Sequence, residues 1–332
     1  MNYIKMSPLT GMVGYGGGAS SLACHSGGCS DPTWYGDRGI FAGGESNVVI
    51  NTIQYVDITS TGNTTDFGDL NTAKRETAGS SGSCISCFVG GDTSTNNSGM
   101  INEIEYISPK SLGNGTDFGN LTAARDNVQS ASSGTRGVFL GGSNSGVNNT
   151  DHIQYITFAT PGNATSFGSA IVSHRHGSGV SNGTRGVYAG GDTTGDSDEI
   201  EYLAFDTAAN SSAFGDLSMA RNYAVSGGNT TRGVWVGGYG SVGGWGYKDR
   251  IDYVTIASTS NASDFGNLGA SKGYMSSGQC GNNTRALFGG GTAGSPGNTM
   301  EYITVATLSN ADDFGLLDTG TWLMGSTANP AS

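Results

Sequence analysis

One pattern recurs through the whole chain at intervals of about fifty residues, and it constrains the fold more than any other feature. Its first part is a tyrosine preceded by Gln, Glu or Asp and followed twelve residues later by Phe-Gly. The tyrosines are Tyr55, Tyr106, Tyr155, Tyr202, Tyr253 and Tyr302, and the phenylalanines are Phe67, Phe118, Phe167, Phe214, Phe265 and Phe314. Such a chain is expected to fold as a repeat protein rather than as two unlike domains.

Each copy also carries a short apolar run that ends in an aromatic residue, one further residue and a pair of glycines. An arginine introduces this run in five of its six copies: Arg38, Arg136, Arg185, Arg232 and Arg285. The N-terminus repeats the tyrosine part of the scheme, because Tyr15-Gly16 lies twelve residues after Tyr3. The 332 residues therefore hold a little under seven copies.

The apolar residues of each copy are β-branched or aromatic and stand in short runs separated by Gly, Asn, Ser, Thr and Asp, and no stretch has a sustained helical period. Each copy therefore predicts four short strands. A single sheet of four strands cannot bury both of its faces, and radial stacking of such sheets into a closed ring leaves few exposed edges. We predict an all-β fold in which residues 1–332 form a single β-propeller domain.

The two ends of the chain predict how the ring closes. Six complete blades would occupy residues 20–316. A seventh, composite blade would take its third and fourth strands from residues 1–18 and its innermost strand from residues 317–332. A six-bladed ring with an N-terminal hairpin packed outside it is the alternative. A composite blade without a second strand would expose an edge that invites a strand from another polypeptide.

Composition and charge exclude several classes of protein. With 58 Gly and 13% charged residues the chain is not built of long solvated helices, while 9% aromatic residues are enough for a core. The net charge of −12 argues against nucleic-acid binding, which depends on Lys and Arg. No apolar run is long enough to span a membrane and no signal peptide is apparent, so we expect a soluble chain without membrane insertion.

These residues also carry a family resemblance. A basic residue, a strand ending in Gly-Gly, an acid or amide before Tyr, and a later aromatic residue follow one another in an order that resembles the kelch repeat, although Phe-Gly stands where kelch repeats usually have Trp. Residues 251–266, IDYVTIASTSNASDFG, are similar to repeats in structural and tail-fibre-like proteins of tailed phages that infect marine cyanobacteria. The resemblance implies a kelch-like propeller and a virion component rather than an enzyme.

Residues that recur in every copy are expected to serve packing. The glycine pair suits a close approach of strand ends, and the repeated Tyr and Phe supply apolar contacts between blades. A basic residue follows most of the phenylalanines by seven positions: Lys74, Arg125, His174, Arg221 and Lys272. Together with the acid or amide before each Tyr, these residues predict either a structural polar network or an anion-binding ring around the channel. We interpret Asn63, Asn114, Asn163, Asn210 and Asn261 as turn residues that tolerate a left-handed backbone.

Candidate binding residues lie where the copies differ. One loop after a glycine pair combines aromatic and charged residues that could stack on a sugar ring and bind its hydroxyls: Tyr239, Trp245, Tyr247, Lys248, Asp249 and Arg250. An insertion with Trp34 and Tyr35 is a second candidate contact patch. Both loops could instead fold back and cover blade edges.

Other motifs for metal binding or catalysis are weaker. An acidic loop could hold a hard cation such as calcium, although its spacing differs from that of an EF-hand loop. Its carboxylates are Asp192, Asp196, Asp198 and Glu199. His174 and His176 could form a metal pair or simply begin a solvated strand. No nucleophile elbow, phosphate loop or dinucleotide fingerprint stands in the required context, so we predict no catalytic residues and no cofactor.

We therefore expect a non-enzymatic phage virion protein of the tail or fibre. Its variable loops would bind a host-surface glycan or other virion proteins, and the particle would leave the cell by lysis. One alternative is a capsid-decorating or adaptor protein whose loops contact protein. The other is a carbohydrate-active enzyme on a propeller scaffold, which would require clustered acidic residues with shifted pKa values beside a deep pocket.

Overall fold

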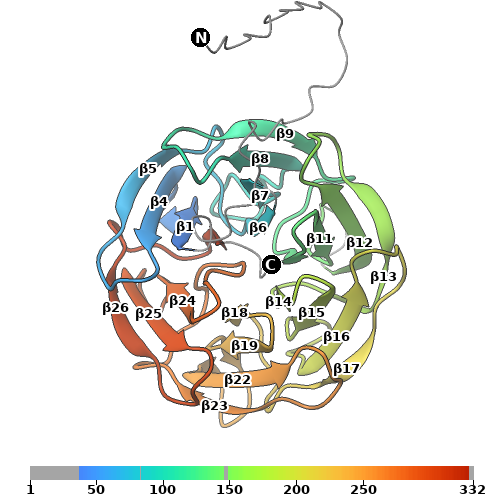
Figure 1. The fold of residues 1–332 in the computed structure, drawn as a ribbon, viewed down its shortest axis with the longest axis vertical. Coiled ribbons are helices and arrows are strands. Elements are labelled where there is room, and N and C mark those ends of the chain that lie inside the picture. Colours follow the sequence, from blue (N-terminus) through green and yellow to red (C-terminus); the bar gives the residue numbers. More distant parts are fainter. Residues whose placement is uncertain (1–36, 83, 146–148, 329–332) are drawn as a thin grey trace, which may run out of the picture.

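The computed structural model describes residues 37–82, 84–145 and 149–328. Apart from two small hairpins, the strands in these ranges form six sheets arranged radially around one axis, which is a six-bladed β-propeller (Figure 1). The all-β propeller prediction is confirmed, whereas the prediction of seven blades is wrong. Within the same ranges there is no helix long and apolar enough to cross a membrane.

Each blade is an antiparallel sheet whose innermost strand lies next to the axis (Figure 1). From the axis outward, blade 1 contains β27 (Gly325–Thr327), β1 (Arg38–Ala42), β4 (Thr52–Asp57) and β5 (Thr65–Asp69); blade 2 contains β6 (Ala78–Gly82), β7 (Ile85–Val89), β8 (Glu103–Ile107) and β9 (Thr116–Asn120); blade 3 contains β10 (Gln129–Ser132), β11 (Arg136–Leu140), β12 (Thr150–Thr157) and β13 (Thr165–His174). Blade 4 contains β14 (Ser178–Ser181), β15 (Arg185–Ala189), β16 (Glu199–Ala204) and β17 (Ser212–Asp216); blade 5 contains β18 (Val225–Gly228), β19 (Arg232–Val236), β22 (Arg250–Thr255) and β23 (Ser263–Asn267); blade 6 contains β24 (Arg285–Gly289), β25 (Thr299–Thr304) and β26 (Asp312–Leu316).

The ring closes through the C-terminal strand. β27 pairs antiparallel with β1, so that Ile40 lies opposite Thr327 and Ala42 lies opposite Gly325. This pairing completes blade 1 with four strands, which is why the C-terminal segment is not the start of a seventh blade. The strands assigned to residues 1–18, and the hairpin of the six-bladed alternative, lie outside the described residues.

Blade 6 has an irregular innermost segment. Its strands β24, β25 and β26 pair with a single register shift between β25 and β26, but the chain before β24 makes only isolated bridges, which include Gly281 to Ala286 and Ser277 to Gly325. Because Gly325 belongs to β27 of blade 1, this segment connects the last blade to the first across the closure.

The hydrophobic core lies between neighbouring blades. Ile104 and Phe118 of blade 2, for example, pack in one buried cluster with Phe139 and Phe158 of blade 3. Within each blade the repeated Tyr and Phe meet edge to face, with ring centroids 5.7–6.0 Å apart. A ring of sheets thus buries both faces of every blade, which a single four-stranded sheet cannot do.

The Phe-Gly repeat is explained by a close backbone contact between blades. A Cβ atom on Gly119 would lie 2.4 Å from the carbonyl oxygen of Gly162 in blade 3, and Gly119 has a φ of +144°. At the same seam Asn163 Oδ1 accepts a hydrogen bond from the backbone N–H of Asn120 over 3.0 Å. The glycine therefore allows the next blade to approach the outermost strand.

The repeated asparagines make this contact at every seam. The equivalent pairs are Asn63 with Leu316, Asn114 with Asp69, Asn210 with Ser169, Asn261 with Asp216 and Asn310 with Asn267, over 3.0–3.1 Å. The interpretation of these residues as left-handed turn residues is wrong, because none of them has a positive φ. Their side chains instead join each blade to its neighbour.

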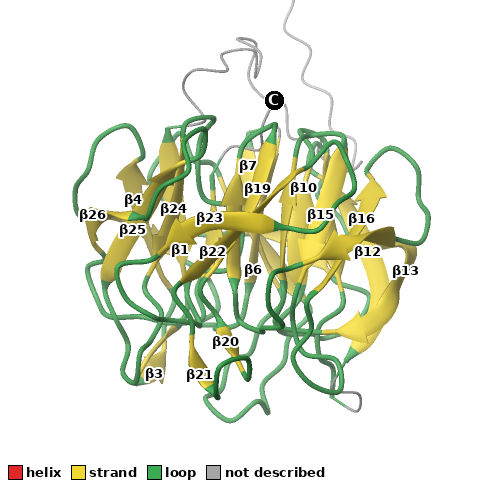
Figure 2. Cartoon of the chain, turned by 90° about the horizontal axis from the view of Figure 1, so that it is seen from below, coloured by secondary structure: helices red, strands yellow, loops and turns green. Residues whose placement is uncertain are grey.

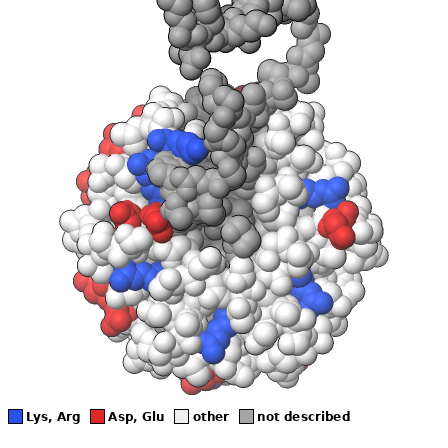
Figure 3. Space-filling model, in the orientation of Figure 1, with Lys and Arg blue, Asp and Glu red and all other residues white. Residues whose placement is uncertain are grey.

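The two ends of the propeller differ in the side chains that they present. We call the lower end in Figure 2 the hairpin face, since it carries the small hairpins β2 (Glu45–Ser46) with β3 (Val48–Val49) and β20 (Tyr239–Gly240) with β21 (Gly246–Tyr247). The opposite end is the arginine face, where Lys and Arg side chains are spaced around the ring (Figure 3).

The arginines of this face are themselves inter-blade contacts. The guanidinium carbon of Arg185 lies 4.3 Å from the ring centroid of Tyr202, and Arg185 Nη1 donates to the carbonyls of Ile256 and Ala257 in the next blade. Equivalent contacts recur at Arg136, Arg232 and Arg285. Cation–π contact and charge-assisted hydrogen bonds thus explain the arginine of the repeat.

Candidate functional site

Six residues with left-handed backbones surround the axis on the hairpin face. Each stands two positions after the basic residue of its repeat, or after Thr321 in the last copy, and their φ values are 50–60°. They are Glu76, Asn127, His176, Tyr223, Tyr274 and Leu323. A positive φ is uncommon for residues other than glycine and costs free energy, and such positions cluster at functional sites.

Five backbone hydrogen bonds link these residues around the axis. The N–H of Glu76 donates to the Leu323 carbonyl over 2.8 Å, and that of Asn127 donates to the Glu76 carbonyl over 3.1 Å. His176, Tyr223 and Leu323 donate in the same way to the ring residue of the preceding blade, over 2.7–3.3 Å. We call the six residues the axial ring. Its backbone is repetitive, but its side chains are acidic, amide, imidazole, phenol and aliphatic.

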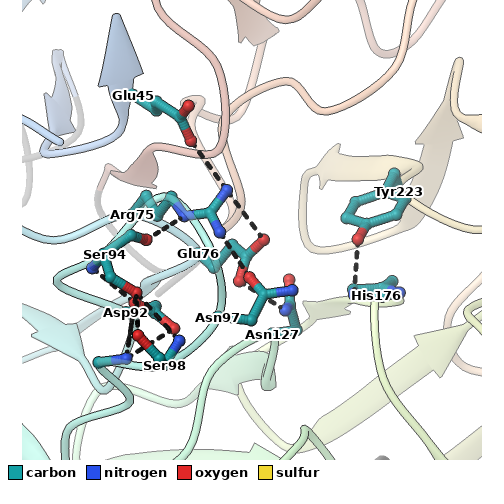
Figure 4. Close-up of polar contacts among 11 residues, drawn as sticks. Glu45, Arg75, Glu76, Asp92, Ser94, Asn97, Ser98, Asn127, His176 and Tyr223 are labelled. Carbon is teal, nitrogen blue, oxygen red and sulfur yellow. Dashed lines mark hydrogen bonds and ion pairs between the residues drawn. The ribbon is translucent and has the colours of Figure 1, made fainter. Parts of the chain in front are cut away.

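Glu76 is the acidic member of the axial ring and lies close to a second buried carboxyl group. Asn127 Nδ2 donates to Glu76 Oε2 over 3.0 Å, and Arg75 Nη1 lies 3.7 Å from Glu76 Oε1 (Figure 4). Burial, followed by the neighbouring Asp126 carboxylate, raises the pKa of Glu76 to about 8. Burial also raises the pKa of Asp126. Glu76 therefore keeps its proton under conditions where ordinary carboxyls are ionised.

Arg75 joins the axial ring to the loops around it. Its Nη1 forms an ion pair with Glu45 Oε2 at 2.8 Å, its Nε donates to the carbonyl of Ser94, and its Nη2 donates to Asn97 Oδ1 (Figure 4). Glu45 belongs to the hairpin of blade 1, whereas Ser94 and Asn97 belong to the glycine-pair loop of blade 2. This guanidinium therefore fixes two loops of the hairpin face next to Glu76.

His176 and Tyr223 form a stacked pair in the axial ring. Their ring centroids are 3.9 Å apart with an interplanar angle of 23°, and Tyr223 Oη lies 2.7 Å from His176 Nε2 (Figure 4). Burial, assisted by Arg175, lowers the pKa of His176 well below its usual value, so the imidazole is neutral. The His176 side chain is only 9% exposed, and its Nδ1 atom is buried without a hydrogen-bond partner.

The two histidines that the sequence places together serve different contacts. His174 Nε2 lies 2.7 Å from Glu201 Oε1 inside blade 4, while His176 belongs to the axial ring. The left-handed backbone at His176 turns the chain between these two environments. They do not form a metal pair, and the interpretation as a solvated strand start is wrong because both side chains are buried.

A small cavity opens beside the axial ring and has a volume of about 30 Å³. Polar groups and apolar side chains both line it. They include Glu76, Asn127, His176, Tyr223, Tyr274 and Ser277 on the polar side, and Val128, Val225, Met275 and Leu323 on the apolar side. A cavity of this size holds one or two water-sized groups and not a sugar ring.

Aromatic rings lead from this cavity to the rim of the hairpin face. Tyr274 contacts Tyr223 at 3.8 Å and Tyr247 at 6.2 Å between centroids. Tyr239 then contacts Tyr247 at 5.4 Å and Trp245 at 5.9 Å. We call these five residues the aromatic crescent. It ends at Trp245, which is 69% exposed.

The predicted binding loop supplies the outer half of the crescent. Tyr239 and Tyr247 are directly opposite in the β20–β21 hairpin, and Lys248 Nζ holds the hairpin by donating to the carbonyls of Val242 and Gly244 over 2.9 Å. Asp249 is exposed. The structure thus brings the three predicted aromatic residues together with Lys248 as a support.

Two other predicted binding elements stand apart from this cluster. Arg250 contacts Ser218 and Asp252 inside blade 5 and does not join the aromatic residues. Trp34 and Tyr35 lie outside the described residues.

The predicted calcium loop does not gather its carboxylates. Asp192 Oδ2 pairs with Arg175 at 3.1 Å, and Asp196 accepts hydrogen bonds from Asn222 Nδ2 and the N–H of Ser241. Asp198 is exposed and Glu199 begins β16. Across residues 37–82, 84–145 and 149–328, no three His, Cys, Asp or Glu side chains are grouped as metal ligands.

The sequence patterns did not predict the axial ring. Its members are about fifty residues apart and differ in chemistry, so no motif joins them. The available signal is position: the residue two places after the basic residue changes from copy to copy, while the basic residue itself recurs in five copies. No protein-family model matches the chain, and no curated protein sequence matches it either. The function is therefore argued from this site alone.

Proposed function

We propose that this protein is a non-enzymatic recognition module that binds a glycan on its hairpin face. One observation carries the proposal. The six residues of the axial ring share a strained backbone conformation and a common position in the repeat, yet their side chains differ. The repeated residues around them make the contacts between blades, so the variable ones are the residues available for recognition.

The aromatic crescent supports a glycan as the ligand. Tyr239 and Trp245 are stacked with an interplanar angle of 29°, and Trp245 presents most of its surface to solvent. Exposed aromatic faces bind the apolar faces of sugar rings, while a few nearby polar groups bind the hydroxyls. Asn127 and His176 supply such groups at the inner end of the crescent.

A carbohydrate-active enzyme is the second candidate, and one observation favours it. Glu76 and Asp126 are neighbouring buried carboxyls with raised pKa values, which suits a general acid. The space beside Glu76 argues for binding instead, because about 30 Å³ does not admit a sugar ring to the carboxyl group. Release of reducing ends from a bound polysaccharide would favour the enzyme.

The place of the module is proposed to be the tail or fibre of a phage virion. The kelch-like order of the repeat and the similarity of residues 251–266 to phage structural repeats support this proposal. Antibody labelling of intact particles tests it, and labelling confined to the head would favour the capsid-decorating alternative.

A glycan array with two matched variants tests the recognition function. Trp245→Ala removes the outer platform of the crescent, and we expect it to weaken binding at least about tenfold. Val48→Ala removes a similarly exposed apolar residue, 62% exposed, from the other hairpin on the same face, and should leave binding unchanged. Absence of binding to any glycan would reject the proposal and favour an adaptor that contacts protein.

A further inference from the structure

Building on the proposed glycan-binding function, we propose that the cavity beside the axial ring receives the exocyclic hydroxymethyl group of a neutral hexose, with His176 Nδ1 as its hydrogen-bond partner. The sugar ring then lies outside the cavity against Tyr274, and the rest of the glycan follows the aromatic crescent toward Trp245.

The size of the cavity selects this group. A cavity of about 30 Å³ holds one or two water-sized groups, so a single carbon with a hydroxyl fits, and a ring or an acetamido group does not. The hydroxymethyl of a hexose is a substituent of that size, and it projects from the ring on a rotatable bond.

The unpaired nitrogen of His176 provides the polar contact. Its Nε2 is already engaged by Tyr223 Oη, whereas Nδ1 is buried without a partner and its ring lines the cavity. A hydroxyl group donates and accepts, so it can bind Nδ1 in either tautomer of the neutral imidazole. Ser277 lines the same cavity and offers a second polar surface.

The apolar lining of the cavity explains why the CH₂ of the hydroxymethyl group adds to binding along with its hydroxyl. Val128, Val225, Met275 and Leu323 form the apolar side of the cavity, which suits a CH₂ group. Removing that group from water adds to binding, while a water molecule alone would leave these walls without an apolar partner.

The lining of the cavity disfavours the corresponding acid. A uronic acid has a carboxylate where a hexose has its hydroxymethyl group, and that carboxylate would enter a cavity lined largely by apolar side chains. Arg75 is already paired with Glu45 and does not line the cavity, and no other Lys or Arg is among the described lining residues. Loss of hydration without a cationic partner therefore disfavours uronates relative to neutral hexoses.

Matched pairs of sugars test the proposal on the unmodified protein. The probes are methyl glycosides of glucose, galactose and mannose together with their 6-deoxy counterparts, titrated by calorimetry. For the hexose that binds, we expect the 6-deoxy sugar to bind at least about tenfold more weakly, because it leaves His176 Nδ1 unpaired and the cavity empty. The ¹⁵N resonance of His176 Nδ1 should shift with the hexose and not with its 6-deoxy partner.

A histidine variant assigns the effect to the residue. His176→Phe should bring the two sugars of a pair within about threefold of each other, whereas His152→Phe, at a half-buried histidine on β12, should keep the full preference. Circular dichroism checks that each variant is folded. The comparison of sugar pairs on the unmodified protein does not depend on the folding of any variant.

The outcomes distinguish failure of the hydroxymethyl site from failure of the proposed glycan-binding function. Equal binding of a hexose and its 6-deoxy form, with both still lost in Trp245→Ala, would reject the hydroxymethyl site and leave glycan recognition intact. A preference that survives in His176→Phe would reject the assignment to His176. If no glycoside binds the unmodified protein while the glycan array finds a ligand, the site is wrong and glycan recognition stands. If the array finds no ligand either, both are wrong.

Discussion

Arg221 Nη2 lies 3.0 Å from Asp252 Oδ2, and both side chains are fully buried. Arg221 comes from the segment that enters blade 5, and Asp252 stands on the third strand of that blade, so the ion pair fastens the connection to the sheet. The same relationship recurs in Lys74 with Glu105, His174 with Glu201 and Lys272 with Glu301, over 2.7–3.0 Å. Because these basic groups face carboxylates, the ring of polar residues is a structural network and not an anion site.

The first prediction concerns this pair. Arg221→Met leaves the Asp252 carboxylate buried, with the partly exposed Arg250 as its remaining cationic partner, and should lower the free energy of unfolding by about 3 kcal/mol. Arg125→Met is the matched control, because its blade has the neutral Gln154 in place of the acid. The control should lower the free energy of unfolding by about 1 to 2 kcal/mol, because it removes the hydrogen bonds of Arg125 to Gly141 and Thr150. Urea unfolding measures both, and equal losses would contradict the account of the network.

The second prediction concerns the close contact at the outer seams. In Gly119→Ala the new methyl group would meet the Gly162 carbonyl at 2.4 Å in a backbone conformation that suits glycine. We expect a loss of about 2 to 4 kcal/mol in stability. Gly162→Ala, on the other side of the same seam, places its Cβ in open space and should change stability by less than about 1 kcal/mol. Thermal unfolding of the two variants compares them directly, and a tolerated Gly119→Ala would show that the blades can separate at this seam.

The third prediction is a dependence of stability on pH. The pKa of Glu76 is about 8 in the folded chain and near 4.5 when unfolded, so the folded chain binds this proton more tightly. The stabilisation is complete below pH 4.5 and is lost as the pH rises toward 8, by about 2 to 4 kcal/mol. Glu76→Gln resembles the protonated carboxyl and should flatten this decline, whereas Asp57→Asn, at an exposed position, should retain it. Denaturant unfolding from pH 5 to 8.5 measures the effect, and stability that stays level or rises over this interval would show that the pKa of Glu76 is not raised.

The fourth prediction concerns ring closure. Removing residues 325–332 deletes β27 and exposes the edge of β1, which should lower the melting temperature and promote association through the free strand. Removing residues 329–332 alone keeps β27 and should leave the protein monodisperse. Light scattering and thermal melts distinguish the two truncations, and a monomeric, equally stable chain without β27 would mean that the closure contributes little.

Part of the binding site could be predicted because its residues are close together in the sequence. Tyr239, Trp245 and Tyr247 lie within one short loop, so their proximity follows from the chain itself, and the hairpin brings them together as expected. The glycine pairs are also local features. A Cβ on Gly91 would lie 2.6 Å from the Arg75 carbonyl, which is the close approach that the repeated glycines predict.

What the sequence determined by itself is the repeating unit: the short strands, the recurring Tyr and Phe, and the glycines all follow from patterns within one copy of about fifty residues. The number of blades was decided by the tertiary structure, because the inner edge of blade 1 is filled by β27 from the far end of the chain. The axial ring was decided in the same way. Its six unlike residues lie together because each repeat places the same backbone position next to the axis. The circular arrangement of the blades makes these positions neighbours in space although they are distant in the chain.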